Sequence, residues 1–277
     1  MSQAYTYKYP HPALTADCVI FGFDGKELKI LLIERGNEPC KGCWAFPGGF
    51  MNIDETIEQC ARRELKEETR LEPANIEQFH TFSDVNRDPR ERVVTVAFIG
   101  LVKQSEVVGG DDAARAQWFA IKDIPRLAFD HDYILRVAQR TLKERIHFEP
   151  IGFELMEDEF SMPDLQRLYE AILEVKFDRR NFEKKMLQLG ILDQIGNDDN
   201  EPTIQGSQKM VMKDFDSIFG ESTRKNNRFM SFMIAETPKT NQSIPEHTWS
   251  RGRNRKFRFN RKKYDEMKEK GIFKIEF

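Results

Sequence analysis

Residues 48–71 read GGFMNIDETIEQCARRELKEETRL, a pair of glycines followed by a segment rich in glutamate. On an α-helix, side chains three and four positions apart lie on one face, so Glu64, Glu67 and Glu68 form a single carboxylate cluster. Like charges this close repel one another, and a divalent cation such as Mg²⁺, which takes oxygen ligands, offsets that repulsion. The alternative, a solvated helix face, explains each glutamate singly but not the cluster beside a glycine loop and Arg63.

The neighbouring residues supply supports for this cluster. Gly48 and Gly49 have no side chain and let the backbone approach closely, so the Gly48 carbonyl is a further candidate ligand. Arg63 can reach back to Glu55 with a charge-assisted hydrogen bond and hold the loop against the helix. The predicted metal ligands are therefore Glu64, Glu67, Glu68 and Gly48.

The stretch resembles the Nudix box, G-x5-E-x7-R-E-U-x-E-E-x-G-U, in which U is a bulky apolar residue. One position departs from the pattern, because Arg70 stands where the family has glycine. A glycine there suits a left-handed helix exit, which costs a residue with a side chain about 1 kcal/mol. The box positions that match at the required spacing are Gly49, Glu55, Arg63, Glu64, Leu65, Glu67, Glu68 and Leu71.

The resemblance implies a Nudix α/β/α sandwich that hydrolyses a nucleoside diphosphate linked to another group, with Mg²⁺ or Mn²⁺ as cofactor. Metal ions at the cluster would neutralise the pyrophosphate and lower the pKa of a bound water for in-line attack. The general base is either a glutamate of the cluster or one of Asp111 and Asp112. The catalytic roles fall on Glu64, Glu67, Glu68 and Arg63.

The class of substrate is suggested by short segments outside the box. RDPR at 87–90, RVVTVAF, GDDA at 110–113, Trp118 and LAFDH at 127–131 together resemble the ADP-ribose pyrophosphatase branch. Singly, each arginine is equally well explained as a surface residue in a loop, and His131 is expected to cap or pack rather than catalyse. The candidate substrate-binding residues are Arg35, Arg87, Arg90 and Asp112.

The rest of residues 1–149 completes a mixed α/β domain. Two strands over 13–35 flank Asp24-Gly25, a dipeptide typical of hairpin turns. The apolar spacing predicts a helix over 54–68 with Asp54 as its N-cap. Further strands are expected around IEQFHTFS, RVVTVAFIGLV and QWFAI, and an amphipathic helix over 130–147 ends the domain.

Residues 150–277 have the outline of a second, smaller winged-helix domain. A helix begins at Ser161-Met-Pro-Asp, where Ser161 is the predicted N-cap. A second helix runs over about 179–189 and stops at Gly190. The polar stretch over about 196–248 is interpreted as an insertion. A strand at KFRFN, a short helix over 264–270 and a strand at IFKIEF follow.

Residues 249–263, WSRGRNRKFRFNRKK, contain eight basic side chains and no acidic one. Such a cluster attracts anions locally. Residues 151–192 and 256–277 resemble the winged helix of Nudix-related transcriptional regulators. This resemblance implies double-stranded DNA as a partner and a homodimer that meets paired half-sites. The alternative is a solvated basic face on an accessory domain. The resemblance assigns base-proximal roles to Arg179, Arg180 and Lys184, and phosphate contacts to Arg253, Arg255 and Arg258.

Two functions remain open at this point. The first is a working Nudix pyrophosphohydrolase that cleaves ADP-ribose or a related nucleoside diphosphate derivative and also binds DNA. The second is a transcriptional regulator of NAD or sugar metabolism whose Nudix domain senses ADP-ribose or a sugar without hydrolysing it. The three intact glutamates favour hydrolysis, and an enzyme that destroys its own effector would combine both functions.

The composition and the apolar runs argue against a membrane-spanning or secreted protein. The chain is 39% hydrophobic and 32% charged with a net charge of −3, as expected of a soluble globular protein. Apolar runs fall short of the ~18 residues of a membrane span. No signal peptide precedes the first strand, so a cytoplasmic location is expected.

Four cysteines, Cys18, Cys40, Cys43 and Cys60, are too few for a disulfide scaffold in 277 residues. Cys40 and Cys43 have the spacing of a redox or zinc pair. A zinc site needs a second pair of ligands, which the sequence lacks, so they are interpreted as incidental.

Overall fold

The structure, a computed structural model, forms two compact units. One comprises Met1–Glu144 and Gly152–Met156, and the other Arg145–Ile151 and Glu157–Phe277. Residue 150, where the sequence analysis begins the second domain, lies in Arg145–Ile151, a segment of the second unit. The residues that the structure describes are 8–73, 75–107, 109, 113–146, 149–195 and 255–269.

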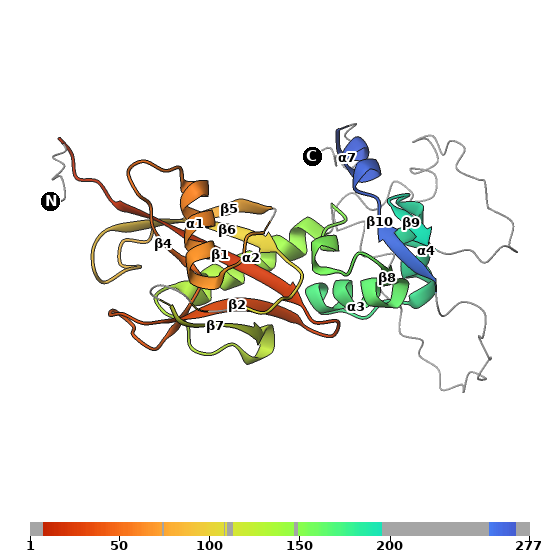
Figure 1. Cartoon of the computed structure of the whole chain (residues 1–277), viewed down its shortest axis with the longest axis horizontal. Coiled ribbons are helices and arrows are strands. Elements are labelled where there is room, and N and C mark those ends of the chain that lie inside the picture. The colour runs from red at the N-terminus through yellow and green to blue at the C-terminus, as the bar shows by residue number, and fades with distance from the viewer. Residues whose placement is uncertain are drawn as a thin grey trace, which may run out of the picture. The chain divides into compact units, whose positions relative to one another are not determined.

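A mixed seven-stranded sheet forms the centre of the N-terminal unit (Figure 1). Its strands are β1 (Ala13–Phe23), β2 (Leu28–Arg35), β3 (Trp44–Ala45), β4 (Gly48–Phe50), β5 (Ile76–Phe82), β6 (Val93–Leu101) and β7 (Ala113–Ala120). The strand order is β3-β2-β1-β6-β5, with β4 paired to β1 and β7 to β2. β1 and β6 run parallel, whereas the β1–β2, β1–β4 and β5–β6 pairs are antiparallel.

The hairpin between β1 and β2 forms at the predicted turn. The Asp24 carboxylate accepts hydrogen bonds from the backbone N–H groups of Lys26 and Glu27 at 2.9 and 2.8 Å. Gly25 has φ 88°, a conformation that glycine adopts without a side-chain clash. The turn sets the pairing of Phe21 with Ile30.

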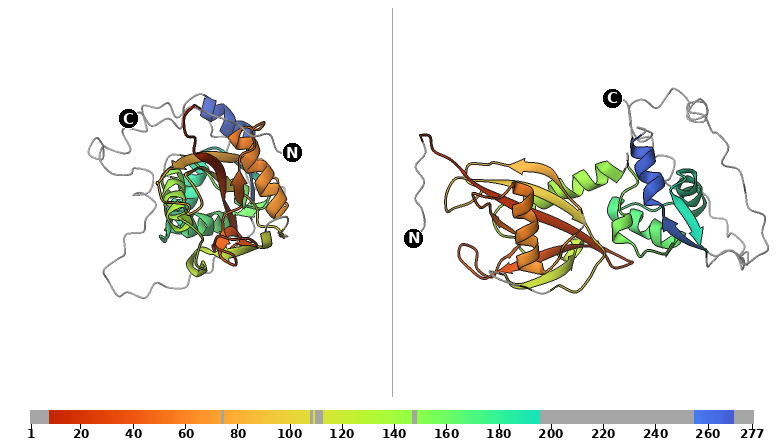
Figure 2. Two further views of the ribbon diagram at one scale, coloured as in Figure 1. Left: turned by 90° about the vertical axis from the view of Figure 1, so that its left-hand side faces the viewer. Right: turned by 45° about the horizontal axis from the view of Figure 1, so that its top comes forward.

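Helices cover both faces of this sheet (Figure 2). They are α1 (Ile57–Thr69) and α2 (His131–Ile146), with the short 3₁₀ helices η1 (Ile121–Asp123) and η2 (Phe153–Leu155). Ala16 and Cys18 of β1 pack in one core with Leu65 of α1. Asp17 lies between them in sequence and therefore faces the other side, where it lies 3.7 Å from His131 of α2. The α/β/α sandwich implied by the Nudix resemblance is confirmed.

Helix α1 begins later than the sequence analysis expected. Thr56 is the N-cap: its hydroxyl accepts from the Gln59 N–H at 3.2 Å, and the Gln59 side chain accepts from the Thr56 N–H at 2.8 Å. This reciprocal pair satisfies two backbone donors at once. The prediction of Asp54 as N-cap was therefore wrong.

Arg70 ends α1 in the left-handed conformation, with φ 65° and its N–H bonded to the Lys66 carbonyl. It adopts the backbone of the family's glycine despite carrying a side chain. We expect Arg70→Gly to raise the free energy of unfolding by about 1 kcal/mol, because glycine reaches this conformation at lower steric cost. Equilibrium urea denaturation measures the change, and activity should be retained.

Arg70→Ala is the matched control for this prediction. Alanine also removes the guanidinium but keeps the Cβ atom that disfavours positive φ. If the alanine variant gained as much stability as the glycine variant, the effect would come from the arginine side chain and not from the backbone.

The C-terminal unit contains helices packed on a small sheet. Its elements are β8 (Phe160–Ser161), α3 (Met162–Leu173), α4 (Arg179–Gln188), β9 (Leu192–Ile195), β10 (Lys256–Phe259) and α7 (Arg261–Glu269). The sheet order is β8-β10-β9. Ser161 and Asp164 form the predicted capping box of α3, and Leu165, Tyr169 and Phe182 are fully buried. This is the expected winged helix.

The two long strands of this sheet are far apart in the sequence. β9 and β10 pair antiparallel, with Ile195 opposite Lys256, so the intervening chain joins the two strands of the wing. The polar insertion over about 196–248 and the closing strand at IFKIEF both lie outside the described residues. Among the helices described, every one is too short or too polar to cross a bilayer.

Candidate functional site

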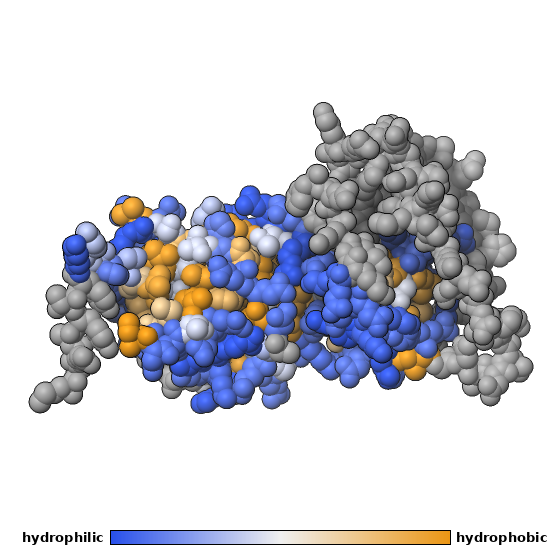
Figure 3. Space-filling view, turned by 90° about the horizontal axis from the view of Figure 1, so that it is seen from above, coloured by the Kyte–Doolittle hydropathy of each residue, from blue (hydrophilic) through white to orange (hydrophobic). Residues whose placement is uncertain are grey.

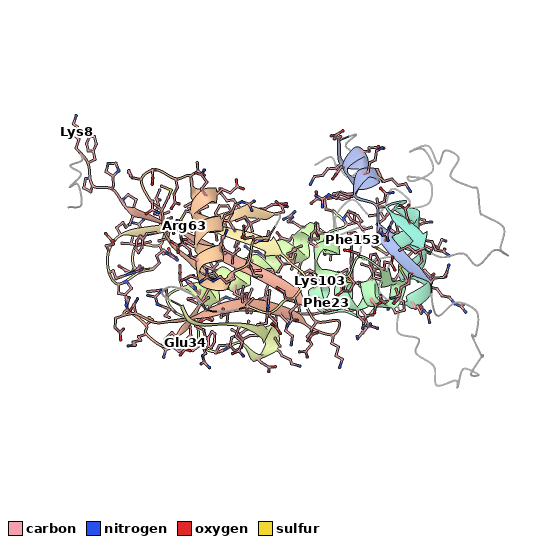
Figure 4. All side chains as sticks on the ribbon, in the orientation of Figure 1. Lys8, Phe23, Glu34, Arg63, Lys103 and Phe153 are labelled. Atoms are coloured by element: carbon pink, nitrogen blue, oxygen red, sulfur yellow. The ribbon has the colours of Figure 1, made fainter. Side chains whose placement is uncertain are left out.

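Arg63 on α1, labelled in Figure 4, connects the glycine loop to the glutamates. It pairs with both oxygens of Glu55, through Nε at 3.0 Å and Nη2 at 2.6 Å. Nη2 also donates to the Phe50 carbonyl, and Nη1 donates to Glu64 and Glu67 at 2.7 and 3.0 Å. The predicted brace from Arg63 to Glu55 is present, and Arg63 lowers the pKa of Glu55 to about 2.

Glu68 is the buried member of the carboxylate cluster, with only 6% of its surface exposed. It accepts a hydrogen bond from the Gly48 N–H at 2.9 Å. Burial, reinforced by the nearby carboxylates of Glu64 and Asp17, raises the pKa of Glu68 to about 8. Burial likewise raises the pKa of Glu64. The cluster therefore holds negative charge where water stabilises it poorly.

Gly48 and Gly49, which the sequence analysis assigned to a loop, lie in β4 and make close contacts. A Cβ atom at Gly49 would lie 2.4 Å from a Glu64 oxygen, and one at Gly48 would lie 2.1 Å from the Ala16 carbonyl. A side chain at Gly48 would therefore separate β4 from the backbone of β1, and one at Gly49 would displace the Glu64 carboxylate.

The donor chemistry fits a hard divalent cation. Glu64, Glu67, Glu68 and the loop carbonyls are oxygen donors, and the raised pKa of buried Glu68 indicates a carboxylate that a cation would stabilise. The side chains are not spread as a ready-made cage, because Arg63 holds Glu64 and Glu67. Among the described residues, no three His, Cys, Asp or Glu side chains are placed close enough together to hold a metal ion.

A buried polar network lies on the opposite face of β1. Arg87 makes a two-point ion pair with Asp130, at 3.0 and 2.8 Å, and lies 3.6 Å from Asp17. Thr95 donates to Asp17 at 2.7 Å. Only 4% of the Arg87 side chain is exposed. Arg87 is thus buried in an ion pair with Asp130, and its role as a substrate contact stays a prediction.

Sequence reasoning missed Asp17 and Thr95. The available signal was an aspartate inside the apolar strand sequence ALTADCVIFGF. A buried carboxylate is almost always paired, so this position alone predicts a partner. The partners come from β6 and the loop after β5 and had no local signal.

Arg35 and Arg90 converge on one aromatic ring. Their guanidinium carbons lie 4.9 and 5.6 Å from the centre of the Phe129 ring, and Arg90 also lies 5.0 Å from that of Phe50. Arg90 is paired with Asp88 at 3.0 and 2.7 Å. Phe129 has φ 53°, an uncommon backbone for a bulky residue. These arginines remain candidate substrate contacts, while Asp112 lies outside the described residues.

His131 has the packing role that we expected. It stacks on Phe46 with ring centres 5.0 Å apart, and its Nδ1 accepts from the Phe46 N–H at 3.0 Å. Burial lowers the pKa of His131. The neutral ring therefore holds the chain two residues before Gly48.

The outer face of α4 carries the proposed base-proximal residues. Arg179, Arg180 and Lys184 are exposed, whereas Phe182 and Met186 are buried on the inner face. The described residues of this unit are mostly hydrophilic on the side shown in Figure 3. The three basic residues thus share the solvent side of one helix.

The basic cluster over 249–263 is partly neutralised, contrary to our expectation. Arg255 pairs with Glu183 of α4, and Arg258 pairs with Glu159 at 2.9 Å. Lys263 pairs with Asp193 at 2.6 Å. These acidic partners lie in other segments of the chain, so a count of charges within residues 249–263 does not include them. Arg253 lies outside the described residues.

Two known protein domains match this chain, one in each of its two parts. The model of the NUDIX domain matches residues 11–138, and that of the NrtR DNA-binding winged helix domain matches residues 152–207. The ADPR responsive transcriptional repressor NtrR of Acinetobacter baylyi is 31% identical over 70% of this chain and 80% of its own length. The chain belongs to the Nudix family. Its C-terminal unit is the winged helix of the NrtR type.

Two further proteins, one an enzyme and the other solved as a complex with DNA, are also similar to this Nudix protein. An ADP-ribose pyrophosphatase of Methanocaldococcus jannaschii is 44% identical over 46% of this chain and 73% of its own length. The crystal structure of Shewanella oneidensis NrtR complexed with a 27mer DNA has a TM-score of 0.60 and 30% identity, covering 68% of this chain and 88% of the other. The Nudix domain therefore resembles an enzyme, and both domains together resemble a DNA-binding regulator.

Proposed function

We propose that this Nudix protein hydrolyses the pyrophosphate of ADP-ribose or a related nucleoside diphosphate derivative, and that its winged helix binds double-stranded DNA. The observation that carries the hydrolase proposal is the assembled box, with Arg63 bracing Glu55 and Glu68 bonded to the glycine loop. The 44% identity to an ADP-ribose pyrophosphatase supports the choice of substrate.

The cluster has the groups that this reaction needs. Bound Mg²⁺ or Mn²⁺ would neutralise the pyrophosphate and acidify the attacking water; Glu64, Glu67, Glu68 and Gly48 would hold it. Arg63 fixes the loop by holding the Phe50 carbonyl and Glu55. Arg35 and Arg90 supply positive charge for the substrate phosphates. A glutamate of the cluster, Asp111 or Asp112 serves as general base.

A sensing role is the second candidate, and the winged helix favours it. The Acinetobacter baylyi relative is named as an ADPR responsive repressor, and it matches across both domains. In this second candidate function, ADP-ribose or a sugar binds the Nudix domain and alters DNA binding without being hydrolysed. The DNA-binding form is proposed to be a homodimer, because paired half-sites require two winged helices.

The decisive experiment measures products. We expect the full chain with Mg²⁺ or Mn²⁺ to convert ADP-ribose to AMP and ribose 5-phosphate, with a turnover on the order of 1–10³ s⁻¹. A panel of nucleotide sugars and dinucleotides, analysed by chromatography, defines the preferred second group. Tight ADP-ribose binding without turnover would select the sensor, and inertness toward the whole panel would contradict hydrolysis.

A further inference from the structure

The turn between β2 and β3 carries a thiol pair, Cys40 and Cys43, that neither the catalytic nor the DNA-binding role uses. We propose that these two cysteines are a redox modification site, which forms a reversible disulfide by reaction with a low-molecular-weight disulfide. The inference rests on the shape of the turn, the packing of the two side chains and the contrast with the other two cysteines.

The turn brings the two residues to disulfide range. The Cys43 N–H donates to the Cys40 carbonyl at 3.0 Å, the hydrogen bond of a four-residue β-turn whose end Cα atoms lie within about 7 Å. Disulfides span Cα separations of about 4.4–6.8 Å. Gly42, at the third position, has φ 77°, as a type II turn requires.

The two side chains also lie on the same side of the turn. Both are partly buried against one small cluster formed by Ile33, Ala45 and Ala128. Lys41 and Gly42 between them are exposed, so a small reagent can approach the turn. Both cysteines are reduced in the structure.

The turn is built around Arg35. The Arg35 N–H donates to the Cys43 carbonyl at 2.9 Å, and its carbonyl accepts from the Gly42 N–H at 2.9 Å. Its Nε donates to the Pro39 carbonyl at 3.0 Å. Closing a disulfide across the turn therefore constrains the segment that holds this arginine.

The proposed reaction is a two-step exchange. One thiolate of the pair attacks a sulfur of glutathione disulfide, forming a mixed disulfide and releasing one glutathione thiolate. The second thiolate attacks the protein sulfur of that mixed disulfide, forming the Cys40–Cys43 bond and releasing the second glutathione thiolate. The two released thiolates take up the two protons of the cysteines. The pair loses two electrons, which reduce glutathione disulfide to two glutathione molecules.

The remaining cysteines serve as internal controls. Cys18 and Cys60 are fully buried, and burial raises the pKa of both thiols. Reaction requires an accessible thiolate. We therefore expect both to stay reduced in the folded protein under conditions that oxidise the turn.

The test equilibrates the full chain in glutathione buffers from reducing to oxidising, quenches with N-ethylmaleimide and maps peptides by mass spectrometry. We expect the peptide with Cys40 and Cys43 to change from doubly alkylated to an internal disulfide, and dithiothreitol to reverse the change. In Cys43→Ser the reaction should stop at a glutathione adduct on Cys40. Hydrogen exchange at Gly42 and Cys43 should slow several-fold on oxidation of the wild type but not of the Cys40→Ser/Cys43→Ser variant.

Three results would overturn the proposal. These are stable glutathione adducts on the wild-type pair without an internal disulfide, disulfides between two chains, and oxidation of Cys18 or Cys60 before the turn. None of these readouts depends on ADP-ribose hydrolysis, so the thiol site and the proposed function stand or fall separately.

Discussion

Glu68→Gln should lower the rate of ADP-ribose hydrolysis by about 10²–10³-fold, the size of effect that follows loss of one preorganised electrostatic group. Glutamine keeps the volume of the buried side chain, and its oxygen can still accept the Gly48 N–H, now 2.9 Å from Glu68. What is lost is the negative charge that would face the cation. Steady-state kinetics with Mg²⁺ measures the change.

The same substitution should stabilise the metal-free protein at high pH. The pKa of Glu68 is raised in the folded state from 4.5 to about 8. Its stabilising contribution is therefore fully present below about pH 4.5 and is lost as the pH rises toward 8. We expect Glu68→Gln to melt above wild type in EDTA at pH 8, and the difference to shrink toward pH 5.

Glu58→Gln is the matched control on the same helix. Glu58 is exposed and pairs with Arg62 at 3.1 Å, a surface pair of little energetic weight. Its loss should leave both rate and melting temperature close to wild type. Full activity in Glu68→Gln, with Glu58→Gln unchanged, would remove Glu68 from the catalytic machinery.

Arg180→Ala and Lys184→Ala should each weaken binding to a specific operator by about 1–3 kcal/mol, while random duplex is affected less. Both side chains lie exposed on α4, the helix that a winged helix places in the major groove. Mobility-shift titrations against fragments from the gene neighbourhood, with random duplex in parallel, measure the discrimination. Lys176→Ala, which removes an exposed lysine outside α4, is the control.

Arg255→Ala and Arg258→Ala should act differently, by weakening binding to all duplexes alike. Each lost phosphate contact should reduce the slope of log affinity against log salt by about 0.9. Their ion pairs with Glu183 and Glu159 must open first, so their effects should be smaller than those of the α4 residues. No duplex retention at micromolar protein and about 50–100 mM salt would leave the winged helix as a packing module.

The features that the sequence determined by itself depend on short separations along the chain. The helical period places Glu64, Glu67 and Glu68 on one face wherever the helix lies. The turn at Asp24 and the capping box at Ser161 are likewise local, because the donor and acceptor are within three residues. The match to the Nudix box was readable for the same reason, since its residues span one loop and one helix.

Tertiary structure alone decided which charged side chains are paired and buried. Arg87 pairs with Asp130, 43 positions away, and Arg255 pairs with Glu183, 72 positions away. Neither partner carries a sequence signal, because burial and pairing of a charge depend on which elements the fold brings together. The burial that raises the pKa of Glu68 arises in the same way, from a loop and a strand packed against its helix.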